Sequence, residues 1–211
     1  MRHNKDRSKK YKVSSRTILT KTFFAAAYIF LCISSASAKD ERVSRTTVVL
    51  QPEKTVITWM LYDPMHTVRG TFKLKRGLVS VDPVDGSAEG LIEVDARTGE
   101  SGNATRDRRM HASILESDRY PDISFRPTHV TGKIPPLADG VVKLDGILHL
   151  HGTDHPLQLV INFHQSTSGL VATTHFVIPY VDWGMKDPST FIFRVGKTVE
   201  INIETVNYEI R

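Results

Sequence analysis

Beyond its first 45 residues, the chain is a succession of short runs in which apolar and polar residues alternate. In the run 55–62, for example, Ile57, Trp59 and Leu61 share one face and polar or smaller residues share the other. A period of two is typical of a strand with one buried face. The same reasoning predicts strands at 46–50, 55–62, 68–74, 78–81, 88–96, 122–131, 142–150, 157–163, 170–178 and 199–208.

Turn residues separate these runs. Asp63-Pro64, the segment 83–86 and the segments 152–156 and 166–169 have the composition of tight turns. Many strands of about five to ten residues joined in this way predict an all-β fold, either a sandwich or an antiparallel up-and-down barrel. A barrel of about eight strands encloses a space that side chains fill or that holds one small ligand.

One segment departs from the alternating pattern. Met110, Ile114 and Leu115 fall at helical spacing, and Asn103 or Thr105 can cap the first turn. A proline soon afterwards prevents the helix from continuing. The sequence therefore predicts one short helix lying across one end of the sheet structure.

The first 38 residues have the composition of a secretion signal peptide. Residues 1–21 hold eight Lys or Arg and one acid, the apolar run 23–33 follows, and Ala36-Ser37-Ala38 ends the segment. The run is shorter than the roughly 20 residues of a spanning helix. We expect cleavage after Ala38 and a periplasmic or secreted protein without a membrane span, with an uncleaved signal anchor as the alternative.

The expected cleavage changes the charge of the protein. The leader holds eight of the 28 basic residues and one of the 23 acidic residues, which leaves 20 and 22 in the mature chain. This balance gives no basic surface in bulk for nucleic acid. Cys32 is the only cysteine and leaves with the leader, so no disulfide can form. Residues 39–45 are charged and predicted to be a flexible start, and 46–211 are predicted to be one domain.

The sequence contains no recognisable catalytic set. It has no G-x-S-x-G nucleophile elbow, no cysteine after the leader and no glycine-rich phosphate loop. Its Asp and Glu residues are scattered, so no carboxylate pair can be nominated for acid–base work. We therefore expect a binding protein rather than an enzyme.

Histidines provide the one candidate for metal chemistry. His149 and His151 are two apart on a predicted strand and would share a face, where His155, His164 or His175 can complete a zinc or copper site. The alternative is that they occupy the solvent face, because the leucines beside His149 take the apolar one. No metal is assigned, and a histidine-based metal-binding protein or enzyme stays an alternative function.

Several motifs are similar to those of a known family. The Arg106-Asp107 pair opens the predicted helix, and Tyr120-Pro121 leads into a strand. These features resemble the YceI-like family, and further segments resemble it in the same order, at 66–72, 148–157 and 199–203. Together they span about 46–211.

This resemblance implies an extended, lipocalin-like barrel with a long apolar pore and a periplasmic or secreted location. It also implies a polyisoprenoid or related amphiphilic lipid as ligand, and a possible homodimer. Two segments depart from the family pattern: 51–55 lacks the family's acid and histidine, and 182–187 matches only loosely. If they shape the pore mouth, they affect which ligand is bound.

We therefore expect an exported carrier that sequesters a long apolar lipid and needs no other cofactor. A protein-binding module with a packed core, linked to stress or adhesion, is a further alternative. Candidate pore residues are Trp59, Phe72, Met110, Phe125, Leu148 and Phe163. Candidate headgroup or rim residues are Arg106, Arg109 and Trp183. Each set has a purely structural alternative. The aromatic residues can simply pack the core, and the Arg-Asp pair can simply fix the helix on the barrel.

Overall fold

A computed structural model gives the structure of most of the chain beyond residue 43. The predicted signal peptide at 1–38 and residues 39–43 of the predicted flexible start lie outside the described residues. Among the described residues, no helix combines the length and the apolar character needed to cross a membrane. The described residues are 44–63, 66–133, 139–167, 169–191, 194–206 and 209–210.

The described residues form ten strands and a few short helical turns. The helical elements are the 3-10 turn η1 (Pro52–Lys54), the α-helix α1 (Ala104–Arg109) and the π-helical turn η2 (Met110–Leu115). The strands are β1 (Thr46–Leu50), β2 (Thr55–Tyr62), β3 (Thr67–Val81), β4 (Ala88–Glu100), β5 (Asp122–Thr131), β6 (Gly140–Leu150), β7 (Thr153–Ser166), β8 (Gly169–Ile178), β9 (Val199–Val206) and β10 (Glu209–Ile210).

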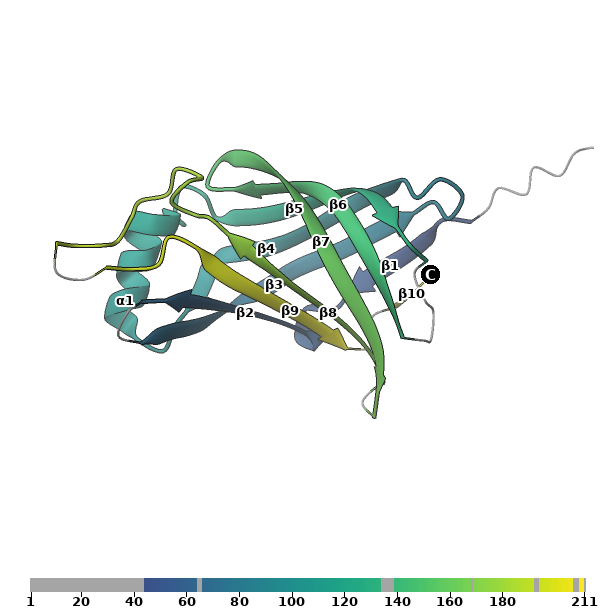
Figure 1. The fold of residues 1–211 in the computed structure, drawn as a ribbon, viewed down its shortest axis with the longest axis horizontal. Coiled ribbons are helices and arrows are strands. Elements are labelled where there is room, and N and C mark those ends of the chain that lie inside the picture. Colours follow the sequence, from purple (N-terminus) through teal and green to yellow (C-terminus); the bar gives the residue numbers. More distant parts are fainter. Residues whose placement is uncertain are drawn as a thin grey trace, which may run out of the picture. The chain divides into compact units, whose positions relative to one another are not determined.

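Eight of these strands close into a ring (Figure 1). From β2 to β9 each strand pairs antiparallel with the next in sequence, and β9 closes on β2. β1 pairs with the second half of β3 and with β10, so it prolongs the ring beyond β2. The fold is the predicted antiparallel up-and-down barrel, which has no free edges within the ring.

The alternation read from the sequence fixes which side chains face inward. Along β6, Val142, Leu144, Gly146, Leu148 and Leu150 are buried, and the residues that alternate with them are less so. The bounds expected for β1, β2 and β5 are confirmed. β4, β6 and β7 are longer than expected, and β7 begins at Thr153, inside the turn expected at 152–156. β3 is one continuous strand where two runs were expected, because its bulged pairing with β4 carries it through the polar residues between them.

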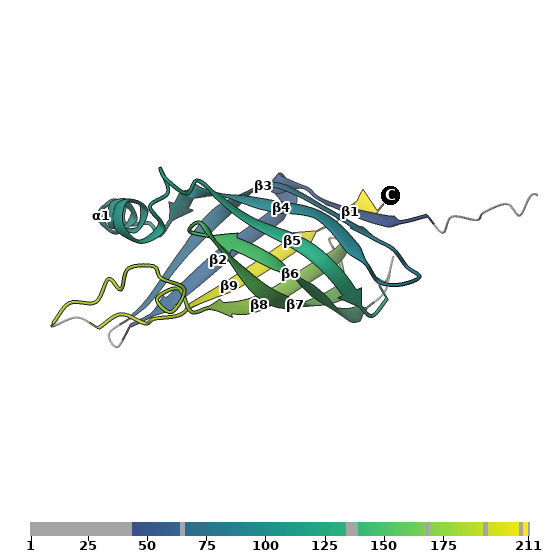
Figure 2. The ribbon, with the colours of Figure 1, turned by 90° about the horizontal axis from the view of Figure 1, so that it is seen from above.

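The predicted helix is confirmed at one end of the barrel. The Asn103 side chain accepts hydrogen bonds from the backbone N–H groups of Thr105 and Arg106, each at 3.1 Å, as an N-cap does. α1 continues directly into η2, which ends at Glu116 in a left-handed conformation with φ 44°. Figure 2 shows α1 and the loop after β8 on opposite sides of the same barrel end.

Gly70 allows the Trp59 indole to lie flat against the neighbouring strand. The two residues are paired in register between β2 and β3. A Cβ atom at Gly70 would lie 2.4 Å from the Trp59 ring and 2.1 Å from the carbonyl oxygen of Glu100. Both distances are far below van der Waals contact, so even a methyl group does not fit here.

We expect Gly70→Ala to destabilise the protein by about 1–3 kcal/mol, because the added methyl group must displace backbone or the buried indole. The measurement is the free energy of unfolding in urea. Lys73→Ala on the exposed face of the same strand is the control, with an expected change within about 0.5 kcal/mol. Equal stability of the two variants would contradict the close approach.

Candidate ligand-binding cavity

The barrel encloses a cavity of about 750 Å³. This volume lies within the roughly 300–1,000 Å³ typical of small-molecule sites. All eight strands of the ring contribute to its wall, and every side chain that they contribute is apolar. These residues are Ile57, Trp59, Leu61, Val68, Phe72, Ile92, Val94, Ile123, Phe125, Leu148, Leu150, Leu157, Leu159, Phe176, Ile178, Val199, Ile201 and Ile203.

Polar lining residues gather at one end of the cavity. They come from the β2–β3 turn, from α1 and η2, and from the loop between β8 and β9, and not from the strands. Those with charged or imidazole side chains are Asp63, His66, Arg106, Arg109, Lys186 and Asp187. The cavity is therefore amphipathic along its length, with a long apolar interior and one polar mouth.

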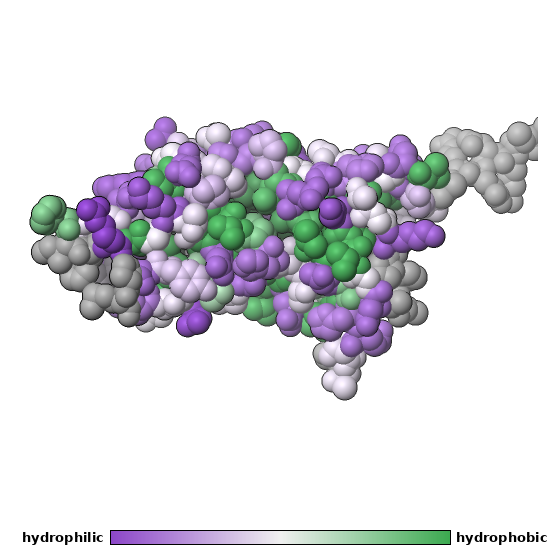
Figure 3. All heavy atoms as spheres, viewed as in Figure 1, coloured by the Kyte–Doolittle hydropathy of each residue, from purple (hydrophilic) through white to green (hydrophobic). Residues whose placement is uncertain are grey.

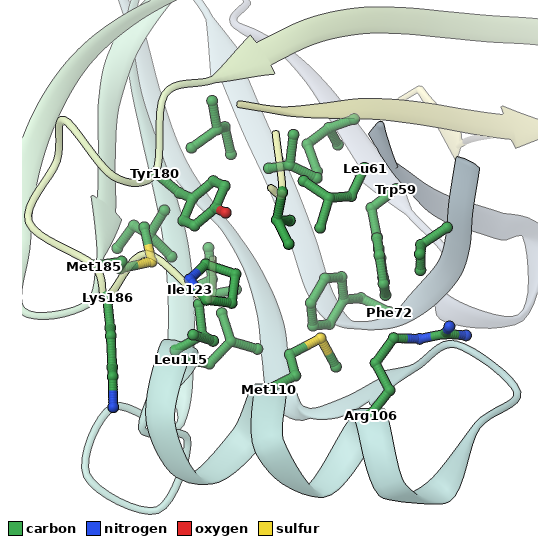
Figure 4. Close-up of a pocket in the computed structure, with 18 of the residues that line it drawn as sticks. Trp59, Leu61, Phe72, Arg106, Met110, Leu115, Ile123, Tyr180, Met185 and Lys186 are labelled. Carbon is green, nitrogen blue, oxygen red and sulfur yellow. The ribbon is translucent and has the colours of Figure 1, made fainter. Parts of the chain in front are cut away.

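Apolar side chains of the helical turn and of the loop cover the cavity at this mouth. Figure 4 shows Met110 and Leu115 projecting from the helix toward Phe72 and Ile123. Met185 faces them from the loop after β8, and it is buried. Flexible or branched side chains thus cover the mouth, and they can change rotamer without disrupting the strand pairing.

A polar network attaches the helix to the barrel rim. Arg106 donates from Nε to the Ser101 hydroxyl at 2.7 Å and from Nη2 to the Ser101 carbonyl at 2.9 Å. The same hydroxyl donates to Asp107. The His111 ring bonds the Gly99 carbonyl at 2.8 Å through Nε2 and the buried Ser117 hydroxyl at 3.0 Å through Nδ1. These contacts fix the helix that carries Met110 over the opening.

Tyr180 holds the base of the opposite loop. Its hydroxyl donates to the Gly196 carbonyl at 2.7 Å and so joins the two arms of the loop. Burial raises the pKa of Tyr180 to about 12, so the phenol keeps its proton and this hydrogen bond at physiological pH. Higher up, the Val195 N–H donates to the Ser189 hydroxyl at 3.0 Å. Two hydrogen bonds therefore hold the arms of the loop together below its tip.

A second, smaller cavity of about 110 Å³ lies farther along the interior. It is lined by apolar and threonine side chains that include Leu74, Val142 and Phe163. The two cavities share four lining residues, Ile57, Ile92, Leu159 and Ile203, so they adjoin at this ring of side chains.

The structure brings most of the sequence-predicted pore residues to the main cavity. Trp59, Phe72, Met110, Phe125 and Leu148 line it. Phe163 lines the second cavity instead, because its position on β7 is opposite Gly140 at the far end of β6. Their role in binding a lipid stays a prediction.

The predicted headgroup residues are placed differently from one another. Arg106 and Arg109 line the mouth, but Arg106 is bound to Ser101 as described above. Trp183 is not among the residues that line either cavity. Its ring stacks on His155 at a centroid distance of 3.9 Å and an interplanar angle of 6°. Trp183 therefore packs the loop against β7, and its role at the headgroup or rim stays a prediction.

The histidine pair expected to share a face does not do so. β6 ends at Leu150, and His151 follows with φ 52°, which turns its side chain away from the direction of His149. His149 Nδ1 lies 2.6 Å from Asp154, and His151 Nε2 lies 2.8 Å from Glu116. In the part of the chain that the structure describes, no group of three His, Cys, Asp or Glu is arranged to hold a metal ion.

Several lining residues were not among the pore candidates named from the sequence. Leu61 and Ile123 share a strand face with Trp59 and Phe125, so the period of two was a sufficient signal for both. Lys186 lies in a loop without any periodicity, and only the loose family resemblance of segment 182–187 raised a place at the mouth for it.

A closed eight-stranded barrel with an internal apolar cavity defines the lipocalin-like class of folds. The model of one family, described as the YceI-like domain, matches residues 48–207 of this chain. The chain therefore belongs to the YceI-like family, as its motifs indicated. No curated protein matches the chain in sequence.

Solved structures share the fold. BcnA of Burkholderia cenocepacia is 12% identical with a TM-score of 0.60, and the match covers 74% of this chain and 97% of BcnA. A polyisoprenoid-binding domain from Saccharophagus degradans, implicated in plant cell wall breakdown, is 16% identical with a TM-score of 0.58. That match covers 78% of this chain and 98% of the domain. At such identities the similarity shows the fold alone.

Proposed function

We propose that this protein is an exported carrier that sequesters one long apolar chain, of the polyisoprenoid or a related class, inside its barrel. The observation that carries the proposal is the composition of the cavity wall, to which the eight strands contribute only apolar side chains. Burial of apolar ligand surface contributes about 25 cal/mol per Å², so a long chain binds here with few hydrogen bonds. Membership of the family and the polyisoprenoid-binding relative support this ligand class.

The polar end of such a ligand belongs at the mouth. Arg109 and Lys186 line the mouth from α1 and from the loop, and both side chains are exposed to solvent there. An Arg guanidinium or a Lys ammonium can hold a phosphate or another oxygen of the headgroup. Arg106 already donates to Ser101 and acts first in fixing the helix.

Sequestration rather than catalysis suits this arrangement. The strand walls around the cavity present no hydroxyl nucleophile and no carboxylate to a bound chain. The leader predicted at 1–38 supports export, and the homodimer implied by the family resemblance stays a prediction.

We expect Phe72→Glu to weaken binding of a long-chain polyprenyl alcohol by about tenfold or more, because a carboxylate in the apolar wall must be desolvated or must recruit water. The measurement is displacement of a fluorescent apolar probe by the alcohol. Val177→Glu, on the outward face of β8 where Val177 is 45% exposed, is the matched control and should bind as the unmodified protein does. Undiminished binding by a folded Phe72→Glu protein would remove Phe72 from the binding site.

The four side chains shared by the two cavities also limit how far a chain can extend. Ile57, Ile92, Leu159 and Ile203 stand between about 750 Å³ of space on one side and about 110 Å³ on the other. A chain longer than the main cavity must push between them. Truncating one of them joins the two spaces.

We therefore expect Ile203→Ala to shift the best-bound member of a polyprenyl alcohol series toward longer chains. Val142→Ala is the control, since Val142 lines the second cavity only and its truncation leaves the constriction intact. Affinities for the whole series are compared among the three proteins. Parallel length profiles for Ile203→Ala and Val142→Ala would show that the constriction does not set chain length.

A further inference from the structure

Two segments of the mouth end, α1 and 179–198, carry exposed side chains of mainly positive charge. In α1 and in the described part of segment 179–198, five exposed residues are cationic: Arg108, Arg109, Lys186, Arg194 and Lys197. In the same residues one exposed side chain is acidic, Asp182. Asp107 and Asp187 are less exposed and are hydrogen-bonded to Ser101 and Ser189. The chain after residue 38 carries 20 basic and 22 acidic residues, so these two segments differ in charge from the chain as a whole. Glu100 and Asp118, just before α1 and just after η2, are exposed acids beside them.

An apolar side chain projects from the same end. Phe191, in the loop after β8, is 96% exposed, the highest exposure among the large hydrophobic residues of the described chain. Figure 3 shows an apolar tip beside strongly hydrophilic side chains at this end of the molecule. An exposed phenylalanine without a packing role is a marker of an interaction surface.

The loop that carries Phe191 is braced below it. The Tyr180–Gly196 hydrogen bond joins its arms at the base, and the Val195–Ser189 hydrogen bond joins them nearer the tip. Figures 1 and 2 show the loop reaching beyond the strands at the barrel end where α1 lies. Phe191 is therefore held out past the cavity mouth and not folded over it.

We propose that the mouth end docks on an anionic phospholipid bilayer, with Phe191 inserted among the lipids and the five cations facing their phosphates. Cations around an apolar anchor are the composition of surfaces that lie on membranes, where apolar burial and electrostatic attraction add. Arg109 and Lys186 line the cavity mouth and also belong to this surface. Docking therefore places the opening against the bilayer.

Docking in this way gives an apolar ligand a direct route between the bilayer and the cavity. A greasy chain that leaves a bilayer through this opening passes from hydrocarbon into an apolar cavity without crossing bulk water. The surface is defined by its own charges and by Phe191, so the docking proposal goes beyond the carrier proposal and can fail separately from it.

The test is co-sedimentation with vesicles that contain phosphatidylglycerol, compared with vesicles of phosphatidylcholine alone. We expect the protein to bind the anionic vesicles and to be released as salt increases. Phe191→Ser should weaken this binding by about tenfold, because a buried phenylalanine ring is lost. Lys186→Glu/Arg194→Glu should also weaken it, and more at low salt than at high salt.

The matched control is Val84→Ser. Val84 is 75% exposed in the turn between β3 and β4, at the end of β3 remote from the mouth, and it should not contribute. All variants share the same N-terminal segment, so differences among them report on the mouth. Equal binding by Phe191→Ser and the unmodified protein, or no preference for anionic vesicles, would overturn the proposal. Retention of the polyprenyl alcohol by Phe191→Ser separates this outcome from failure of the carrier function.

Discussion

Closure of eight antiparallel strands into one ring is the constraint on which the rest of the structure depends. Each strand points alternate side chains into the interior. In a closed barrel these side chains can be buried only there. Because the strand side chains that line the cavity are apolar, water gains few hydrogen bonds by entering it. The ring is nevertheless too wide for its side chains to fill, so a cavity of about 750 Å³ remains.

The mouth depends on polar contacts that the barrel itself does not need. Arg106 is hydrogen-bonded to Ser101, just after β4, and His111 is hydrogen-bonded to the Gly99 carbonyl. These bonds attach the helix to the end of one strand. Tyr180 closes the loop on the opposite side. These contacts hold apolar covering groups above an apolar space and leave cations at its border. The division between an apolar interior and a charged border follows from which elements contribute which residues.

Much of the fold could be predicted from sequence because periodicity reports burial directly. Trp59, Phe125 and Leu148 reach the cavity from strands whose alternation is unbroken. Residues outside regular elements could not be placed in this way. His151 leaves the face of His149 through a positive φ at the strand end, and Trp183 stacks on His155, a contact between distant parts of the chain. Local pattern carries no information about either event.

The proposed carrier function requires that the apolar interior hold a long-chain lipid. The most direct measurement is native mass spectrometry of the protein purified from its own host, followed by solvent extraction of any bound molecule. We expect a stoichiometric adduct whose extracted mass matches an isoprenoid or other long-chain amphiphile. A protein that is free of ligand under gentle conditions, and that takes up no such lipid when it is offered, would contradict the claim.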